Sequence, residues 1–307
     1  MPLLGRGRMV IRGIAVALSL CVVACGGDDE APPTSPPPAP VAVLGAFPAE
    51  LAALLDRATV EETIEIDGHS FRSGTLGGVP VVMAMTGIGL VNATMTTRML
   101  LANFEVSGIV VSGVAGSPLR IGDVAVPETW TLADGIPIPV SPDWLALAEQ
   151  LAAANIILTQ CTEVPTAETN PVCLPFAPVV VVGGIGRSTD SFGERPFPCQ
   201  PTNDRVFGCD VAGAAAGVPV KDHGAMRGLG DEGEVAPAAE DMETAAVARE
   251  ARAAGVRFIS FRATSDGRED PLMLPGFPAQ FFAYYPLASD NAAAATTAFL
   301  QELAVTR

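Results

Sequence analysis

The stretch VAVLGAFPAELAALLDRA, residues 41–58, indicates the fold class of this 307-residue chain. Its first five residues are apolar or small without interruption, as expected of a strand that is buried on both faces. The following residues, 48–58, carry apolar side chains at helical spacing and have Pro48 in the first turn, where proline is tolerated. A buried strand that passes directly into a helix is the repeating unit of an α/β protein.

The rest of the chain continues this alternation of strands and helices. We expect strands joined by glycine turns over residues 62–85, and further strands at residues 107–116, 121–128, 177–186 and 257–263. We expect helices at residues 90–104, 141–155, 240–253 and 288–303, the second of them capped by Ser141 or Asp143. The pattern predicts one α/β domain over residues 41–307 with a parallel or mixed sheet, and with cysteine-bearing insertions at about 161–235.

The first segment of the chain has the features of an export signal. Arg6, Arg8 and Arg12 precede the apolar run GIAVALSLCVVAC, which is too short to span a bilayer comfortably and ends in small residues. The end of this run, VVAC, resembles a bacterial lipobox in which Cys25 would be lipidated, so residues 1–24 would be a lipoprotein signal peptide. Ordinary secretion with cleavage nearby is the alternative.

A proline-rich segment, residues 25–40, follows the signal and lacks any periodicity. Such a composition stays extended and solvated, as a tether does. We therefore expect an exported protein that is attached to the bacterial cell envelope through a lipid anchor. Gly26, rather than Asp, after the cysteine favours the outer membrane or its periplasmic face.

The mature chain is strongly acidic. Removing the three arginines of the signal takes 18 basic residues to 15, against an unchanged 34 acidic residues, so the net charge falls from −16 to −19. A protein that binds nucleic acid needs positive charge to neutralise phosphates, so this class is excluded.

Four of the six cysteines lie outside the signal, all in one region: Cys161, Cys173, Cys199 and Cys209. An even number in an exported chain favours disulfides, and the sequence-local pairs 161–173 and 199–209 are the simplest of three possible connectivities. A zinc site would need closely spaced ligands, and His69 and His223 are far from such spacing. We expect no metal and no cofactor.

Three carboxylates follow strands or begin helices, where an α/β sheet binds its ligands: Glu50, Glu243 and Asp266. Together with the motifs LGAFPAE, TGIG, SGVAG, IGDVAVPE, DMETAA and RATSD, they resemble the nucleoside phosphorylase superfamily. The nearest branch is the methylthioadenosine/S-adenosylhomocysteine nucleosidases, with some likeness to plant bark storage proteins near YYPLASDNAAAA. The resemblance runs from Val41 to the C-terminus, interrupted at 161–235, and implies a three-layer αβα sandwich with a mixed central sheet.

The resemblance also implies a role for each residue in breaking an N-glycosidic bond, in which the sugar becomes positive and the purine negative. Glu243 would accept hydrogen bonds from the ribose hydroxyls, Met242 would pack against the ribose, and Asp266 would act as general acid at purine N7. The remaining roles are those of Glu50, Thr86 and Arg262 in positioning and deprotonating water, of Phe192 in stacking on the purine, and of Ser265 in orienting Asp266.

Each of these residues also has an ordinary structural interpretation. Glu50 could be a solvated helix carboxylate, Glu243 a charge at a helix start, and Asp266 a turn residue in SDG. Met242 and Phe192 could fill a core, and Arg262 could pair with any carboxylate.

Hydrolysis and phosphorolysis differ in the groups that hold the nucleophile. Phosphorylases of this superfamily clamp phosphate with arginines, whereas this chain has Glu50 near the first strand and Val111 and Val114 at the later turn. We therefore expect a purine nucleosidase, with a phosphate-dependent phosphorylase or a noncatalytic nucleoside-binding or storage-like lipoprotein as alternatives. The resemblance also implies a homo-oligomer, a dimer in the first instance.

Overall fold

The computed structural model describes residues 38–164, 171–190, 195, 197, 199–200, 202–210 and 237–306. Pro38 begins a compact unit that runs to the end of the chain. The expected signal, tether and lipidated Cys25 lie outside the described residues, and so does Phe192.

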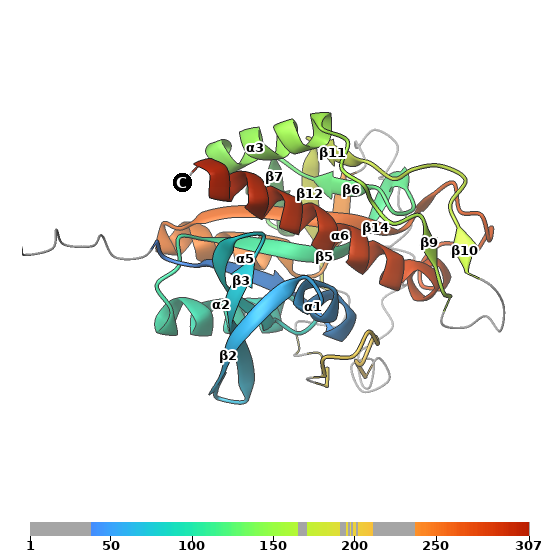
Figure 1. The fold of residues 1–307 in the computed structure, drawn as a ribbon. Helices are drawn as coiled ribbons and strands as arrows, with labels where there is room; N and C mark the ends of the chain where they lie inside the picture. Colours follow the sequence, from blue (N-terminus) through green and yellow to red (C-terminus); the bar gives the residue numbers. More distant parts are fainter. Residues whose placement is uncertain are drawn as a thin grey trace, which may run out of the picture. The chain divides into compact units, whose positions relative to one another are not determined.

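A 12-stranded mixed sheet forms the centre of this unit, and its main path runs β2-β3-β4-β1-β5-β13-β12-β7-β8 (Figure 1). The path consists of β2 (Ala58–Ile66), β3 (His69–Leu76), β4 (Val79–Met85), β1 (Val41–Gly45), β5 (Gly108–Arg120), β13 (Ala239–Asp241), β12 (Ile185–Ser188), β7 (Thr129–Thr131) and β8 (Ile138–Pro139). Three strands lie off the path: β6 (Val124–Val126), β11 (Val180–Val182) and β14 (Arg257–Arg268), of which β14 pairs in parallel with β5.

The helices cover the sheet from both sides. They are α1 (Pro48–Leu55), α2 (Leu90–Asn103), α3 (Pro142–Ala153), α5 (Thr244–Ala254) and α6 (Ala279–Thr306). One hydrophobic cluster joins α1, α3 and α6 to one sheet face through residues such as Val43 and Val110. A second cluster joins α2 and α5 to the other face through residues such as Leu44 and Val111. The predicted three-layer αβα fold with a mixed sheet is confirmed.

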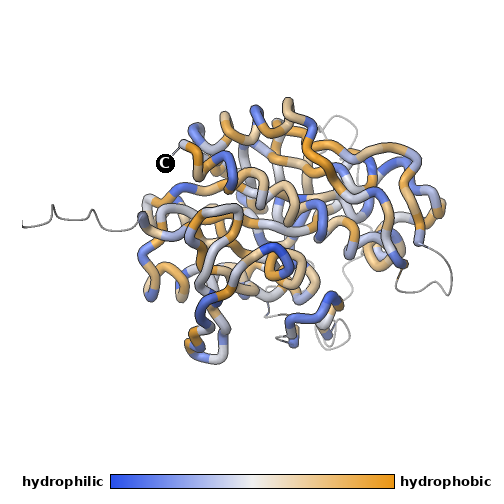
Figure 2. Tube along the Cα trace, viewed as in Figure 1, coloured by the Kyte–Doolittle hydropathy of each residue, from blue (hydrophilic) through white to orange (hydrophobic). Residues whose placement is uncertain are grey.

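The buried strands read as apolar runs because both of their faces are covered. All five residues of β1 are buried, as are the first eight residues of β5. Figure 2 shows hydrophobic residues through much of the interior of this unit and hydrophilic ones along much of its periphery. Gly186 in β12 lies against the indole ring of buried Trp130, where a Cβ would be only 2.6 Å from ring atoms. A larger residue at position 186 would displace this packing.

Three expected elements differ from the structure. The expected helix 240–253 begins at Thr244, because residues 239–241 pair with β5 and β12 as β13. The expected helix 288–303 begins at Ala279 and includes Pro286. Ser141 stands at the N-cap of α3, but its hydroxyl makes no cap bond and instead accepts a hydrogen bond of 2.9 Å from the Phe258 amide.

Both expected disulfides are present in the cysteine-bearing region: Cys161–Cys173 and Cys199–Cys209. The first joins β9 (Cys161–Thr162) to β10 (Val172–Cys173), a separate two-stranded sheet. The same region also supplies β11 and β12 to the main sheet. Within the described residues, no helix has the length and apolar character needed to cross a membrane.

Candidate active site

A buried arginine lies among three buried carboxylates beside the central residues of β5. Arg262, on β14, pairs in register with Gly113 of β5 and is 1% exposed. Its Nε lies 2.9 Å from Oδ2 of Asp241, and its Nη2 lies 3.1 Å from Oε2 of Glu243. A Cβ on Gly113 would collide with Oε1 of Glu50 and lie 2.6 Å from Nη1 of Arg262. Glycine is therefore required here for the close approach of these two side chains.

Glu50 is held by two backbone amides, one just after β1 and one within β5. It occupies the first turn of α1, directly after β1, and is 2% exposed. Its carboxylate accepts hydrogen bonds from the amides of Ala46 and Val114, the latter at 2.7 Å. Burial raises the pKa of Glu50, although Arg262 and the two amides act in the opposite direction. A carboxyl group with a raised pKa is a stronger base than a solvated one.

Glu243 lies at the start of α5, next to Met242, and both side chains are buried. Its Oε1 accepts a hydrogen bond of 2.9 Å from the amide of Gly89, in the TGIG turn. Burial raises the pKa of Glu243 to about 8, with Arg262 lowering it and Asp241 and Glu50 raising it further. Three carboxylates that share one guanidinium leave an excess of buried negative charge, which favours protonation.

Asp266 lies on β14 beyond a bulge and pairs with Gly116 of β5. Its Oδ1 accepts a hydrogen bond of 2.7 Å from the hydroxyl of Ser265, and its Oδ2 would be 2.8 Å from a Cβ on Gly116. Burial raises the pKa of Asp266; the Ser265 bond lowers it and the charge of Glu240 raises it. An aspartate with a raised pKa keeps its proton closer to neutral pH.

The carboxyl groups of Glu50, Glu243 and Asp266 share one region of the molecule. Glu50 bonds to the amide of Val114, and Asp266 lies against Gly116, two residues further along β5 and therefore about 7 Å away along the strand. Glu243 lies close enough to Glu50 for the charge of Glu50 to raise the pKa of Glu243. Residues from β14, α1 and the start of α5 thus meet beside the central residues of one strand, β5.

Thr86 lies in the TGIG turn that follows β4. Its hydroxyl donates a hydrogen bond of 2.8 Å to the carbonyl of Gly87, within its own turn. Its amide donates to the carbonyl of Gly45, at the end of β1. In this structure Thr86 shapes the TGIG turn that presents the Gly89 amide to Glu243.

Asp241 is the residue that the sequence interpretation missed. It accepts hydrogen bonds from the hydroxyls of Ser188 and Thr244 and from the amides of Glu243 and Thr244, besides its ion pair with Arg262. Its side chain thus orders the residues that lead into α5 and holds the guanidinium that faces Glu50 and Glu243. Asp241 lies two residues before the N-cap residue Glu243, so the motif DMET does not present it as an ordinary helix cap.

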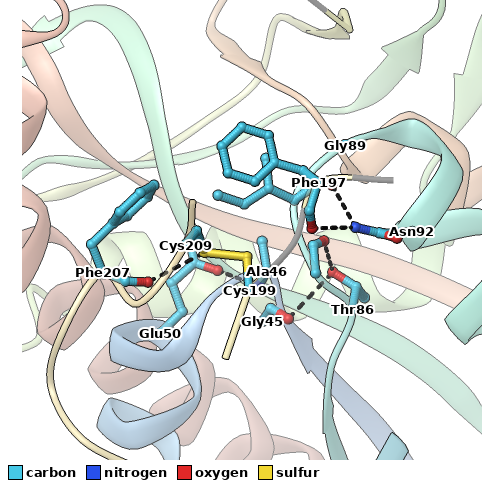
Figure 3. Close-up of a disulfide and its surroundings, with 12 residues drawn as sticks. Gly45, Ala46, Glu50, Thr86, Gly89, Asn92, Phe197, Cys199, Phe207 and Cys209 are labelled. Atoms are coloured by element: carbon cyan, nitrogen blue, oxygen red, sulfur yellow. Dashed lines mark hydrogen bonds between the residues drawn. A yellow bond between two sulfur atoms is a disulfide. The ribbon is translucent and has the colours of Figure 1, made fainter. Parts of the chain in front are cut away.

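A disulfide-closed loop lies against α1 next to Glu50 (Figure 3). The Cys199–Cys209 bond closes it, and Phe207 within it packs on Phe47, with ring centroids 5.5 Å apart. Gly208 lies against Pro48. Arg205, also in this loop, donates hydrogen bonds to Asp56 and Asp290. The loop therefore forms a wall beside the strand-end residue Phe47.

No cluster of three or more His, Cys, Asp or Glu side chains suited to a metal ion occurs in the part of the chain that the structure describes. The four cysteines there are all in disulfides.

The profile of the phosphorylase superfamily matches residues 40–301 of the chain. An uncharacterized protein of Mycobacterium tuberculosis is 37% identical over 213 residues, which are 63% of this chain and 86% of that protein. A 5′-methylthioadenosine/S-adenosylhomocysteine nucleosidase of Geobacillus thermodenitrificans is 38% identical over 90 residues, 28% of this chain and 38% of that enzyme.

The fold is similar to that of a solved nucleosidase. The structure of a 5′-methylthioadenosine/S-adenosylhomocysteine nucleosidase from Colwellia psychrerythraea, in complex with adenine, has a TM-score of 0.59 and 23% identity to this chain. The similarity covers 87% of this chain and 96% of that one.

Proposed function

The chain belongs to the phosphorylase superfamily, and from this premise we propose that it is a nucleosidase that hydrolyses the N-glycosidic bond of a purine nucleoside. The substrate is of the methylthioadenosine or S-adenosylhomocysteine type, and the products are the free base and the free sugar. The arrangement of Glu50 beside Arg262 carries this proposal.

Glu50 favours water over phosphate as the nucleophile. Its buried carboxylate accepts two backbone amides, faces Nη1 of Arg262, and would repel an anion brought to the same place. Val111 and Val114 supply no cation there. A water molecule held between the guanidinium and the carboxylate would lose a proton to Glu50 as it attacks the anomeric carbon.

Glu243 would stabilise the sugar as positive charge develops on it. In its ionised form, whose share grows as the pH rises toward its pKa of about 8, Glu243 accepts hydrogen bonds from the ribose 2′- and 3′-hydroxyls, while Arg262 and the Gly89 amide keep it oriented. Met242 packs its thioether against the ribose beside it. The interaction strengthens as the sugar becomes cationic, which is the requirement for lowering the barrier.

Asp266 would make the purine a better leaving group by donating its proton to N7. Burial supports this role because it raises the pKa of the carboxyl, and the Ser265 hydroxyl fixes its orientation. The purine then departs as a neutral base instead of an anion. Phe192, expected from the sequence to stack on the purine, lies outside the described residues.

An aromatic wall supports an apolar 5′ substituent. Phe47, between β1 and Glu50, lies within 6.0 Å of the rings of Phe207, Phe281 and Tyr285, centroid to centroid. With the base at Asp266 and the hydroxyls at Glu243, this wall is the side left for the 5′ end of the sugar. A methylthio or longer thioether group suits aromatic neighbours better than a bare hydroxyl.

The test is base release by the purified protein from methylthioadenosine, S-adenosylhomocysteine, adenosine and inosine, with and without phosphate. We expect release without phosphate and faster turnover of the thioether nucleosides. Strict dependence on phosphate would identify a phosphorylase instead, and binding without turnover would identify a nucleoside receptor.

The cellular setting is also part of the proposal. The arginine-bearing signal and Cys25 support lipid anchoring at the bacterial cell envelope, where the enzyme would degrade external nucleosides. We propose a homodimer. Globomycin-sensitive processing in the native host, and light scattering of the purified protein, test these two points.

A further inference from the structure

Three charged side chains form a row across four neighbouring strands. Arg187 of β12 pairs in register with Glu240 of β13, Glu240 pairs with Gly116 of β5, and Gly116 pairs with Asp266 of β14. Neighbouring strands lie about 4.8 Å apart, so the row leads from Asp266 to Glu240 and then to Arg187. Gly116 has no side chain to separate Asp266 from Glu240.

The row lies on one face of the sheet. Residues paired across neighbouring strands point to the same face, and successive residues alternate. Ser188 and Asp241 bond to each other on the α5 side, so Arg187 and Glu240, one residue before each, point to the opposite side. Met242 packs in the cluster on that opposite side.

The members of the row also interact. Nη2 of Arg187 lies 3.3 Å from Oε1 of Glu240, and the two side chains are 33% and 13% exposed. The charge of Glu240 reaches Asp266, whose pKa it raises. A ligand that contacts Asp266 therefore lies beside a carboxylate and, one strand further, a guanidinium.

We propose that Glu240 and Arg187 contact the six-membered edge of the purine and select a 6-aminopurine over a 6-oxopurine. This inference rests on the proposed function, because it takes Asp266 as the partner of purine N7. Position 6 of a purine is next to N7, and N1 follows it, in the same order as Asp266, Glu240 and Arg187.

The donors and acceptors of adenine match this order. Its 6-amino group donates to the Glu240 carboxylate, and its N1 accepts from the Arg187 guanidinium. In hypoxanthine or guanine, the 6-oxygen would face the carboxylate and the N1 hydrogen would face the guanidinium. An acceptor would then face an acceptor at position 6, and a donor would face a donor at N1. A 6-oxopurine would therefore lose both hydrogen bonds at once.

The experiment compares adenosine with inosine, which share the same sugar and differ at position 6. The ratio of their kcat/KM values is measured for the wild type, Glu240→Gln and Arg187→Gln. A glutamine amide can present either a donor or an acceptor, so we expect the adenosine-to-inosine ratio to fall by about tenfold or more in each variant. A purely structural defect would lower both substrates equally and leave the ratio unchanged.

Glu250→Gln is the matched control, because Glu250 also forms an ion pair with a partly exposed arginine, Arg98, but lies two turns into α5. Its ratio should equal that of the wild type. An unchanged ratio in the Glu240 and Arg187 variants, or a wild type that prefers inosine, would overturn the inference.

Binding of the free bases separates this inference from the proposed function. Calorimetry on the wild type should show tighter binding of adenine than of hypoxanthine. This measurement depends neither on nucleoside turnover nor on a variant that folds. If the protein binds adenine more tightly than hypoxanthine but shows no turnover, only the proposed function is refuted. Equal or tighter binding of hypoxanthine would refute the inference even in an active nucleosidase.

Discussion

Replacing Glu243 with glutamine should stabilise the folded protein at alkaline pH while it removes most of the turnover. The side chain is buried, and it shares Arg262 with Asp241 and Glu50. Burial raises its pKa from 4.5 to about 8. The contribution of protonated Glu243 to the free energy of unfolding is therefore fully present below pH 4.5. It is lost as the pH rises through about 8.

The size of the effect follows from this window. Between the two pKa values the folded protein keeps a proton that the unfolded chain has released, so the wild type loses about 1.4 kcal/mol of stability per pH unit. A glutamine has no such proton to release. The stability of Glu243→Gln relative to the wild type should thus rise across the window by a total of a few kcal/mol and level off above it.

Denaturant unfolding of both proteins from about pH 5 to about pH 9 measures this difference. Glu149→Gln, on the exposed face of α3, removes a surface charge and should give a nearly constant difference. If Glu243→Gln gains no stability relative to the wild type as the pH rises, the buried excess of negative charge does not exist. Its turnover should fall about a hundredfold or more, and a rate near that of the wild type would remove Glu243 from the proposed mechanism.

Three other variants test the remaining parts of the site. Asp266→Asn should slow adenosine hydrolysis by about a hundredfold or more, but slow a nitrophenyl riboside far less, since that leaving group needs no proton; equal losses on both would contradict the role of Asp266 as general acid. Cys199→Ser should lower the free energy of unfolding by about 3 kcal/mol, the value for a loop of this length, and unchanged stability would show that the loop is held by its other contacts. Phe207→Ala should reduce kcat/KM for methylthioadenosine about tenfold more than for adenosine; equal reductions would exclude an aromatic 5′ wall.

The fold class could be predicted from the sequence because the strands are buried on both faces. Runs of apolar and small residues such as 41–45 and 107–116 fit the covered centre of a sheet or a buried helix, and their glycine turns favour the strand. The short strand β13 overlaps the start of the expected helix 240–253, because three residues give no periodicity of their own. Its pairing with β5 and β12 comes from tertiary contacts that no local pattern encodes.

The candidate site was predicted less completely than the fold. The resemblance names Glu50, Glu243, Asp266 and Arg262, and the structure brings their side chains together beside residues 113–116 of β5. Asp241 was not named, because its importance comes from the burial of Arg262 and not from any spacing. Thr86 was expected to position water, but its hydroxyl bonds to its own turn, a detail that depends on a side-chain rotamer.

The most direct measurement is the mass of the sugar released from methylthioadenosine in phosphate buffer. We predict free adenine and the unphosphorylated thioether sugar, formed at the same rate when phosphate is omitted, and loss of both products in Glu50→Gln. A sugar 1-phosphate as the product, or full activity in Glu50→Gln, would contradict the claim that Glu50 and Arg262 activate water at this site.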